Sequence, residues 1–146
     1  MVITFSVILL GALLLIRPLQ KNNFYMLHCA LMIGTAYYLE NHYYIRPAAF
    51  SHKMLLVFVF FQLVFSNLTA FIAYGVDKRA AVRGNWRVPE NNLHTLEFMG
   101  GWIGAWIAQK VFRHKTKKQS FQTTFKLMIL LELLAIYLLC SYLGLL

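Results

Sequence analysis

An apolar run from Met54 to Val76, without one charged residue, limits what this chain can fold into more than any other feature. About 20 apolar residues suffice for a helix to cross the hydrocarbon core of a bilayer, where only helices and closed barrels satisfy their own backbone groups. Three further apolar runs cover residues 1–16, 24–39 and 125–146. Hydrophobic residues make up 60% of the 146 residues, against about 45–50% in soluble domains. The sequence therefore predicts an all-α integral membrane protein.

The first apolar run, residues 1–16, is followed by Arg17 and Pro18. A secretory signal carries its positive charge before the apolar run, so we expect this run to be a retained first span. The second run, residues 24–39, provides another span. We therefore predict an N-terminal extension of two spans over residues 1–53 and a second membrane domain over residues 54–146.

The spans contain a few polar residues that need partners in hydrocarbon. Gln62, Ser66 and Thr69 recur at helical spacing, so this face should pack against other helices. Glu132 in the last run should be either paired or neutral, because an isolated carboxylate there is costly. Judged by depth, Ser66 and Asn67 are its expected partners.

Basic residues set the expected topology. Nine of the fourteen Lys and Arg residues lie between Asp77 and Phe121, in two clusters that bracket the apolar segment 93–108. Lys126, at the start of the last run, is left out of the count. If segment 93–108 crosses the membrane, the other thirteen Lys and Arg residues divide six against seven between the two sides; if it does not, eleven face the cytoplasm and two face outward. Cytoplasmic loops are enriched in Lys and Arg. We therefore predict four transmembrane helices with both termini outside, plus a central re-entrant or interfacial helix. The alternative is five transmembrane helices.

The central segment is predicted to be one helix from Pro89 to Phe112. Proline suits a first helical position, and Glu90 and Lys110 match the two ends of the helix dipole. Small residues in the segment should let another helix approach closely. These candidate packing residues are Gly100, Gly101 and Gly104.

Three titratable residues near the start of this helix are candidate acid or base groups for catalysis: Asp77, Glu90 and His94. Neighbouring cations should keep carboxylates ionised and leave an imidazole able to accept a proton near pH 7. The same residues could instead form ion pairs that clamp the helix to the following basic loop. The expected partners are then Lys78 or Arg79 for Asp77, and Arg87 or Arg113 for Glu90.

Glu90, His94 and Glu97 also share one helical face at a spacing that metal ligands use. Ion pairing with nearby Arg and Lys explains these residues more simply. No metal and no cofactor is therefore predicted.

Cations and hydroxyl donors cluster in the segment RHKTKKQS, residues 113–120. Arginine binds phosphate through two nitrogens and lysine adds a point charge, so the segment suits an anionic head group at the membrane surface. The alternative is a basic loop that sets topology and binds no specific ligand. The expected ligand-binding residues are Lys78, Arg87, Arg113, His114, Lys115 and Lys118.

Four short motifs follow one another along the chain. They are Tyr74-Gly75-x-Asp77-Lys78, Arg87-Val88-Pro89-Glu90-x-x-Leu93-His94, Gly100-Gly101-x-x-Gly104-Ala105 and Arg113-His114-Lys115-x-x-Lys118-x-x-Phe121. In this order they resemble a family of small bacterial membrane proteins of unknown function, some of which carry a cold-shock domain ahead of the membrane part. The resemblance covers about residue 67 to the last span. It implies an integral membrane protein of the bacterial inner membrane and no established reaction.

The expected function is binding of an anionic lipid or isoprenoid-phosphate head group at the cytoplasmic surface, or a role as accessory subunit of a larger membrane complex or homo-oligomer. The alternative is a membrane-embedded enzyme that acts on a phosphate-bearing or acyl substrate. Nucleic acid is not the expected partner. The net charge of +9 lies in loops beside apolar runs, where anionic lipids are within reach.

Overall fold

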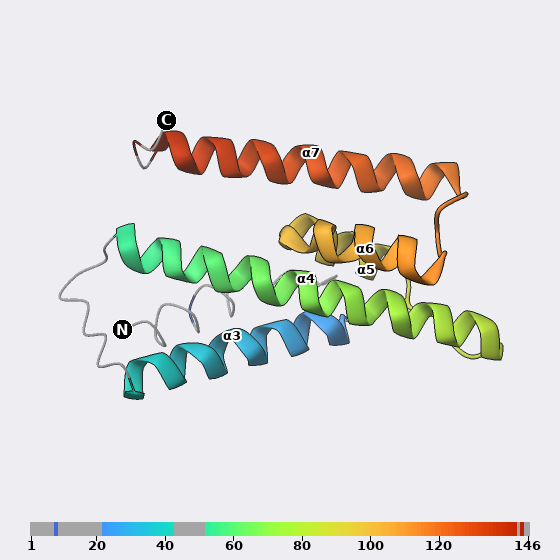
Figure 1. Cartoon of the computed structure of the whole chain (residues 1–146), viewed down its shortest axis with the longest axis horizontal. Helices are drawn as coiled ribbons and strands as arrows, with labels where there is room; N and C mark the ends of the chain where they lie inside the picture. The colour runs from blue at the N-terminus through green and yellow to red at the C-terminus, as the bar shows by residue number, and fades with distance from the viewer. Residues whose placement is uncertain (1–7, 9–21, 43–51, 143, 145–146) are drawn as a thin grey trace.

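The computed structural model describes residue 8, residues 22–42, residues 52–142 and residue 144. This part of the chain is helical and contains no strand, which confirms the predicted all-α class (Figure 1). The predicted first span, residues 1–16, lies outside the described residues apart from position 8.

Three long helices run along the molecule, with α4 between the other two in Figure 1. They are α3 (Asn23–His42), α4 (His52–Arg83) and α7 (Gln119–Tyr142). Two segments, Leu56–Arg83 of α4 and Gln119–Tyr142 of α7, are long and apolar enough to cross a membrane. The third and fourth predicted spans fall on these two segments. By the same measure α3, which covers the second predicted span, is not apolar enough.

The central segment is a hairpin, and the prediction of one continuous helix is wrong. It consists of α5 (Glu90–Leu96), a π-helical turn η1 (Glu97–Gly101) and α6 (Trp102–Phe112). Gly100 breaks the helix with a φ of 95°, a conformation that glycine adopts without the steric cost that other residues incur. In Figure 1, α5 lies behind α6 alongside α4. We call residues 90–112 the α5–α6 hairpin.

Both ends of the hairpin lie at the same end of α4. Asp77 of α4 accepts hydrogen bonds from the backbone N–H of Val88, just before the hairpin, and bonds to His114, just after it. The turn lies further along α4, where the Gln62 side chain donates to the carbonyl of Met99 over 3.2 Å. From position 77 to position 62, α4 advances by about 22 Å. The hairpin therefore extends about 22 Å along α4 from the Asp77 end and then returns to that end.

The hairpin packs tightly against α4 because small residues line the contact. A Cβ on Gly104 would collide with the backbone carbonyl oxygen of Asn67. A Cβ on Gly101 would lie 2.7 Å from the carbonyl oxygen of Ser66. The Asn67 side chain also bonds to both sides of the hairpin turn: its amide donates to the Gly100 carbonyl at 2.8 Å and its oxygen accepts from the Gly104 N–H at 2.6 Å.

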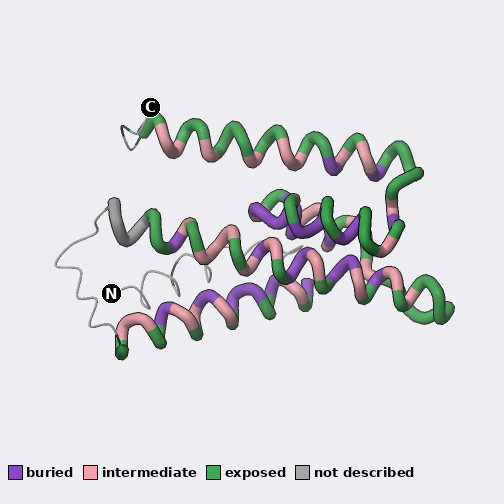
Figure 2. Tube along the Cα trace, viewed as in Figure 1, coloured by how far each residue is buried: buried purple, intermediate pink, exposed green. Residues whose placement is uncertain are grey.

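Buried side chains form two clusters, one on either side of α4. The larger lies between α4, the hairpin and the first turns of α7 and includes Tyr74, Leu93, Leu96 and Phe121. The smaller lies between α3 and α4, where His28 also bonds to Gln62 at 2.8 Å. Figure 2 shows burial in the hairpin and along parts of α3 and α4, whereas most of α7 is exposed or half-buried. In α7 only its first two turns contribute buried residues.

Glu132 does not have the predicted partners. Among the described residues neither Ser66 nor Asn67 bonds to it, because the hairpin turn takes up the Asn67 side chain and Gln62 donates to the Ser66 hydroxyl. The Glu132 carboxylate instead lies beside the hairpin turn, with Oε1 3.3 Å from the position of a Cβ on Gly100.

Candidate functional site

Asp77 holds the two ends of the hairpin together. Its side chain is fully buried. Arg87 donates from Nε and Nη2 over 3.4 and 3.3 Å, His114 Nε2 lies 2.7 Å from Oδ2, and Lys115 Nζ lies 3.8 Å from the same oxygen. A buried carboxylate is stable only when charges and donors compensate it. Asp77 is thus a structural anchor for chain segments on both sides of the hairpin.

Glu90 binds the loop between α6 and α7. Its carboxylate accepts from Lys115 Nζ over 2.6 Å and from Lys118 Nζ over 2.8 and 2.9 Å. Hydrogen bonds from Lys115 and then Lys118 lower the pKa of Glu90 to about 2. The carboxylate therefore stays ionised at neutral pH as an ion-pair partner.

The predicted ion pairs have the wrong partners, although both carboxylates do form a clamp. Asp77 pairs with Arg87 and His114, and Glu90 pairs with Lys115 and Lys118. A straight helix would place the basic loop at the far end from Glu90. Because the chain reverses at the hairpin turn, this loop returns to the first turn of α5.

A second polar cluster is buried in the larger core. Glu97 is fully buried and accepts a hydrogen bond from the Tyr74 hydroxyl, while His94 Nδ1 lies 2.6 Å from its other oxygen. Gln109 donates to the Tyr74 hydroxyl over 3.3 Å and accepts from Gln122 over 2.6 Å. Helices α4, α5, α6 and α7 and the η1 turn are thus joined by one hydrogen-bonded chain.

The sequence did not reveal this chain of hydrogen bonds. Tyr74 looked like any aromatic residue of an apolar run, and Gln109 and Gln122 had no distinguishing neighbours. The available signal was Glu97 itself, since a carboxylate inside an apolar segment requires a donor nearby.

The three residues at metal-ligand spacing, Glu90, His94 and Glu97, do not lie together. Glu90 faces the basic loop, whereas His94 and Glu97 bond to each other. Among the residues that the structure describes, no group of three His, Cys, Asp or Glu side chains is close enough to hold a metal ion.

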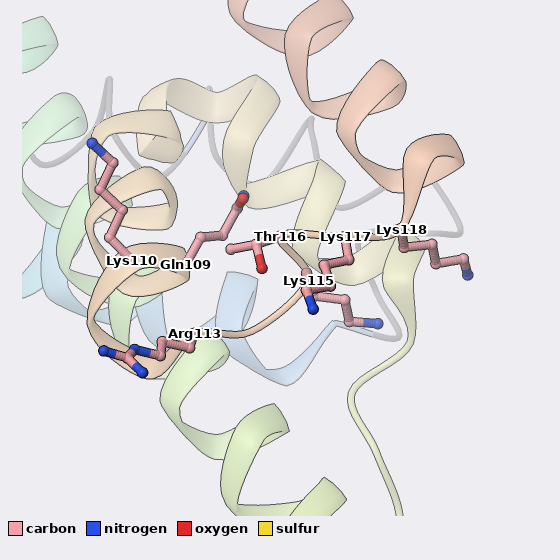
Figure 3. Close-up of a pocket in the computed structure, with 7 residues that line it drawn as sticks. All are labelled: Gln109, Lys110, Arg113, Lys115, Thr116, Lys117 and Lys118. Carbon is pink, nitrogen blue, oxygen red and sulfur yellow. The ribbon is translucent and has the colours of Figure 1, made fainter.

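An open surface cavity of about 640 Å³ lies between the end of α6 and the α6–α7 loop. The loop begins where Arg113 ends α6 in the left-handed conformation, with a φ of 45°, and Lys115 has a φ of 62°. Figure 3 shows Lys110 and Arg113 extending from α6 on one side and the loop lysines on the other, with Gln109 and Thr116 between them. We call this the basic cavity; its lining is Gln109, Lys110, Arg113, Lys115, Thr116, Lys117 and Lys118.

The predicted ligand-binding residues divide into two groups. Arg113, Lys115 and Lys118 line the basic cavity. Arg87 and His114 pair with Asp77 instead, and Lys78 belongs to α4 outside the lining. The lining residues that the prediction omitted are Gln109, Lys110, Thr116 and Lys117. The two lysines could have been found, because both belong to the basic cluster that follows the apolar segment.

Comparison with known proteins places this site in a family. The profile of a family described as "Protein of unknown function (DUF1294)" matches residues 67–121. The uncharacterized protein YsdA of Bacillus subtilis (strain 168) is 40% identical over 77 residues, which cover 51% of this chain and 86% of that protein. This chain belongs to the DUF1294 family. The predicted resemblance to a family of unknown function is thereby confirmed. The DUF1294 match runs from α4 through the hairpin and the basic cavity to the first turn of α7. No solved structure matches the chain significantly.

Proposed function

We propose that this chain is a multi-pass protein of the bacterial cytoplasmic membrane that binds the phosphate head group of an anionic or isoprenoid lipid in the basic cavity. One observation carries the proposal. Five cationic side chains line a single open cavity immediately before α7, a helix apolar and long enough to cross a bilayer. A lipid offers a phosphate at the depth of the cavity and apolar chains at the depth of the helix.

The exposure of the apolar helices supports a membrane location. Only 22% of the most apolar window of α4 and 6% of that of α7 are buried within the molecule. Large side chains such as Phe60, Leu130 and Leu138 are 58–63% exposed. A core helix of a soluble protein would be mostly covered, and exposed apolar surface of this extent requires lipid or another protein.

The path of the hairpin supports four spans rather than five. The hairpin returns to the Asp77 end of α4, so the basic residues before and after it lie at one end of the molecule. Its reach of about 22 Å along α4 is less than the ~30 Å of a hydrocarbon core. In the proposed topology the hairpin re-enters the membrane from the cytoplasm, both basic clusters are cytoplasmic and both termini lie outside. Trp86, 91% exposed in the α4–α5 loop, then lies near the interface that tryptophan favours.

The arrangement of the basic cavity suits an anion. Guanidinium and ammonium groups bind phosphate oxygens through charge-assisted hydrogen bonds. Helix α7 begins at Gln119, directly after the cavity residue Lys118, so the positive end of its dipole adds to the attraction. The exposed leucines further along α7 can accompany the apolar chains of a bound lipid.

Lipid retention tests the proposal. The full chain, purified in mild detergent and examined by native mass spectrometry, should retain anionic lipid. The double variant Arg113→Gln with Lys117→Gln should lose it, because both side chains line the cavity. Arg79→Gln serves as the matched control, since it removes an exposed cation of α4 that is not part of the cavity. The proposal is refuted if no anionic lipid is retained, or if all three proteins retain the same amount.

One contact favours a second function, acid or base catalysis by His94. Glu97 binds Nδ1 of this histidine and orients the ring, and Nε2 has no hydrogen bond within the described part of the chain. Such an orientation is what a general base requires. The other two candidates, Asp77 and Glu90, are held in ion pairs. An enzyme should lose its cellular function in His94→Gln while the variant remains folded; normal function in this variant excludes the catalytic role.

A further inference from the structure

The basic cavity carries more positive charge than neighbouring carboxylates neutralise. Lys115 and Lys118 share Glu90, and Lys115 also approaches Asp77. The remaining three cations, Lys110, Arg113 and Lys117, form no ion pair with a carboxylate within the described residues, where Lys110 lies over the Trp106 ring at 3.7 Å. The cavity lining therefore includes three positive charges that no carboxylate among the described residues compensates.

The cavity also offers hydrogen-bond donors that the fold does not use. In the described part of the chain the Thr116 hydroxyl has no partner. The first N–H groups of a helix have no partner within the helix, and in α7 the N–H of Gln122 is the earliest that bonds to the preceding loop, at the carbonyl of Lys118. Backbone donors of this first turn, which follows the cavity residue Lys118, thus have no partner in the preceding loop.

A phosphodiester matches this surplus of positive charge and hydrogen-bond donors poorly. It carries one negative charge and two unsubstituted oxygens, as in a simple glycerophospholipid. A phosphomonoester carries about −1.5 to −2 charges at pH 7 and three strong acceptor oxygens. A diphosphate ester carries at least as much charge on more oxygens.

We infer that the basic cavity selects a terminal phosphate, either a phosphomonoester or a diphosphate, over a phosphodiester. That the phosphate belongs to a lipid rests on the proposed function. Glu90 contributes to the selection because it occupies Lys115 and Lys118 and leaves the ligand the remaining cations of the lining, Lys110, Arg113 and Lys117.

Competition between lipids that differ only in the head group tests this inference. The full chain in detergent is mixed with dioleoyl phosphatidic acid, a phosphomonoester, and dioleoyl phosphatidylglycerol, a phosphodiester with the same acyl chains. Farnesyl diphosphate is the diphosphate probe. Native mass spectrometry at pH 7.5 should show about a tenfold preference for phosphatidic acid, equivalent to about 1.4 kcal/mol. Arg113→Gln with Lys117→Gln should bring the ratio close to one, while Arg79→Gln should leave it unchanged.

Acidification provides an independent readout. The second ionisation of a phosphomonoester has a pKa of about 6, so at pH 5 phosphatidic acid carries little more than one charge. Its preference over phosphatidylglycerol should then fall several-fold. Phosphatidylglycerol keeps its single charge over this range and thereby controls for titration of the protein itself.

The outcomes separate the inference from the proposed function. Equal retention of both lipids at pH 7.5 overturns the selectivity for terminal phosphate and leaves lipid binding intact. Retention of neither overturns the proposed function. If free glycerol 3-phosphate displaces phosphatidic acid at equal concentration, the cavity takes a soluble phosphomonoester, which supports the phosphate class and overturns the lipid as its source.

Discussion

Gly104→Ala should separate α6 from α4, because the added methyl group has no room. The Cβ would collide with the backbone carbonyl of Asn67, and backbone atoms cannot move aside as a flexible side chain can. Overpacking costs about 1–3 kcal/mol. The hydrogen bond of 2.6 Å from the Gly104 N–H to the Asn67 side chain should weaken as well, which costs about 0.5–1.5 kcal/mol.

Gly34→Ala is the matched control for this substitution. Gly34 lies in α3 with no atom within 4 Å of an added Cβ. Both variants gain the same helix propensity, about 1 kcal/mol for Ala over Gly, so their difference isolates the packing. Gly104→Ala should therefore be less stable than Gly34→Ala by about 1.5–4.5 kcal/mol, from the two costs above.

Thermal unfolding in detergent, followed by circular dichroism, measures this difference. A change of 1 kcal/mol shifts the melting temperature by roughly 2–4 °C for chains near this size, so Gly104→Ala should melt several degrees below Gly34→Ala. Equal melting temperatures would show that α6 does not contact α4 at Asn67, and the hairpin packing described above would be wrong.

Three further substitutions test the polar contacts. Glu90 has a pKa of about 2 in the folded chain against an ordinary value of 4.5, so its contribution is complete above pH 4.5 and is lost as the pH falls toward 2; this partly exposed pair is worth about 0.2–1 kcal/mol. Glu90→Gln should make the melting temperature depend less on pH over this range. A pH dependence equal to that of the wild type would contradict the ion pairs. Tyr74→Phe removes a donor from buried Glu97 and should cost about 1–3 kcal/mol; an unchanged melting temperature would exclude that bond. Asp77→Asn should speed tryptic cleavage after Arg87 and Arg113, because the ends of the hairpin lose their anchor. Cleavage at the wild-type rate would contradict the anchoring role of Asp77.

The helical class could be predicted because it depends on local composition. Uncharged runs of the length seen at residues 54–76 have few alternatives to a helix. The hairpin could not be predicted in the same way, since the sequence from Pro89 to Phe112 is compatible with a continuous helix. The reversal at Gly100 depends on Asn67, whose side chain bonds to the Gly100 carbonyl and the Gly104 N–H. A contact between residues more than thirty positions apart leaves no local signal.

The positive charge of the candidate site could be predicted from the sequence, but the ion-pair partners of its residues could not. The basic cluster after the apolar segment already indicated where an anion would bind. Which cations remain free depends on the reversal of the chain, which brings Lys115 and Lys118 onto Glu90 and leaves Arg113 and Lys117 in the cavity. The prediction paired Glu90 with Arg87 or Arg113, because charge alone does not show which cation the chain reversal brings to this carboxylate.

Cysteine accessibility tests most directly whether the hairpin enters and leaves the membrane on one side. Single cysteines would replace Arg83, before the hairpin, and Lys117, after it, in a chain in which Cys29 and Cys140 are replaced by alanine. A re-entrant hairpin predicts that a membrane-impermeant maleimide labels neither position in intact cells and both after the membrane is permeabilised. Labelling of one position in intact cells and the other only after permeabilisation would show that the segment crosses the bilayer, and the four-span topology would be wrong.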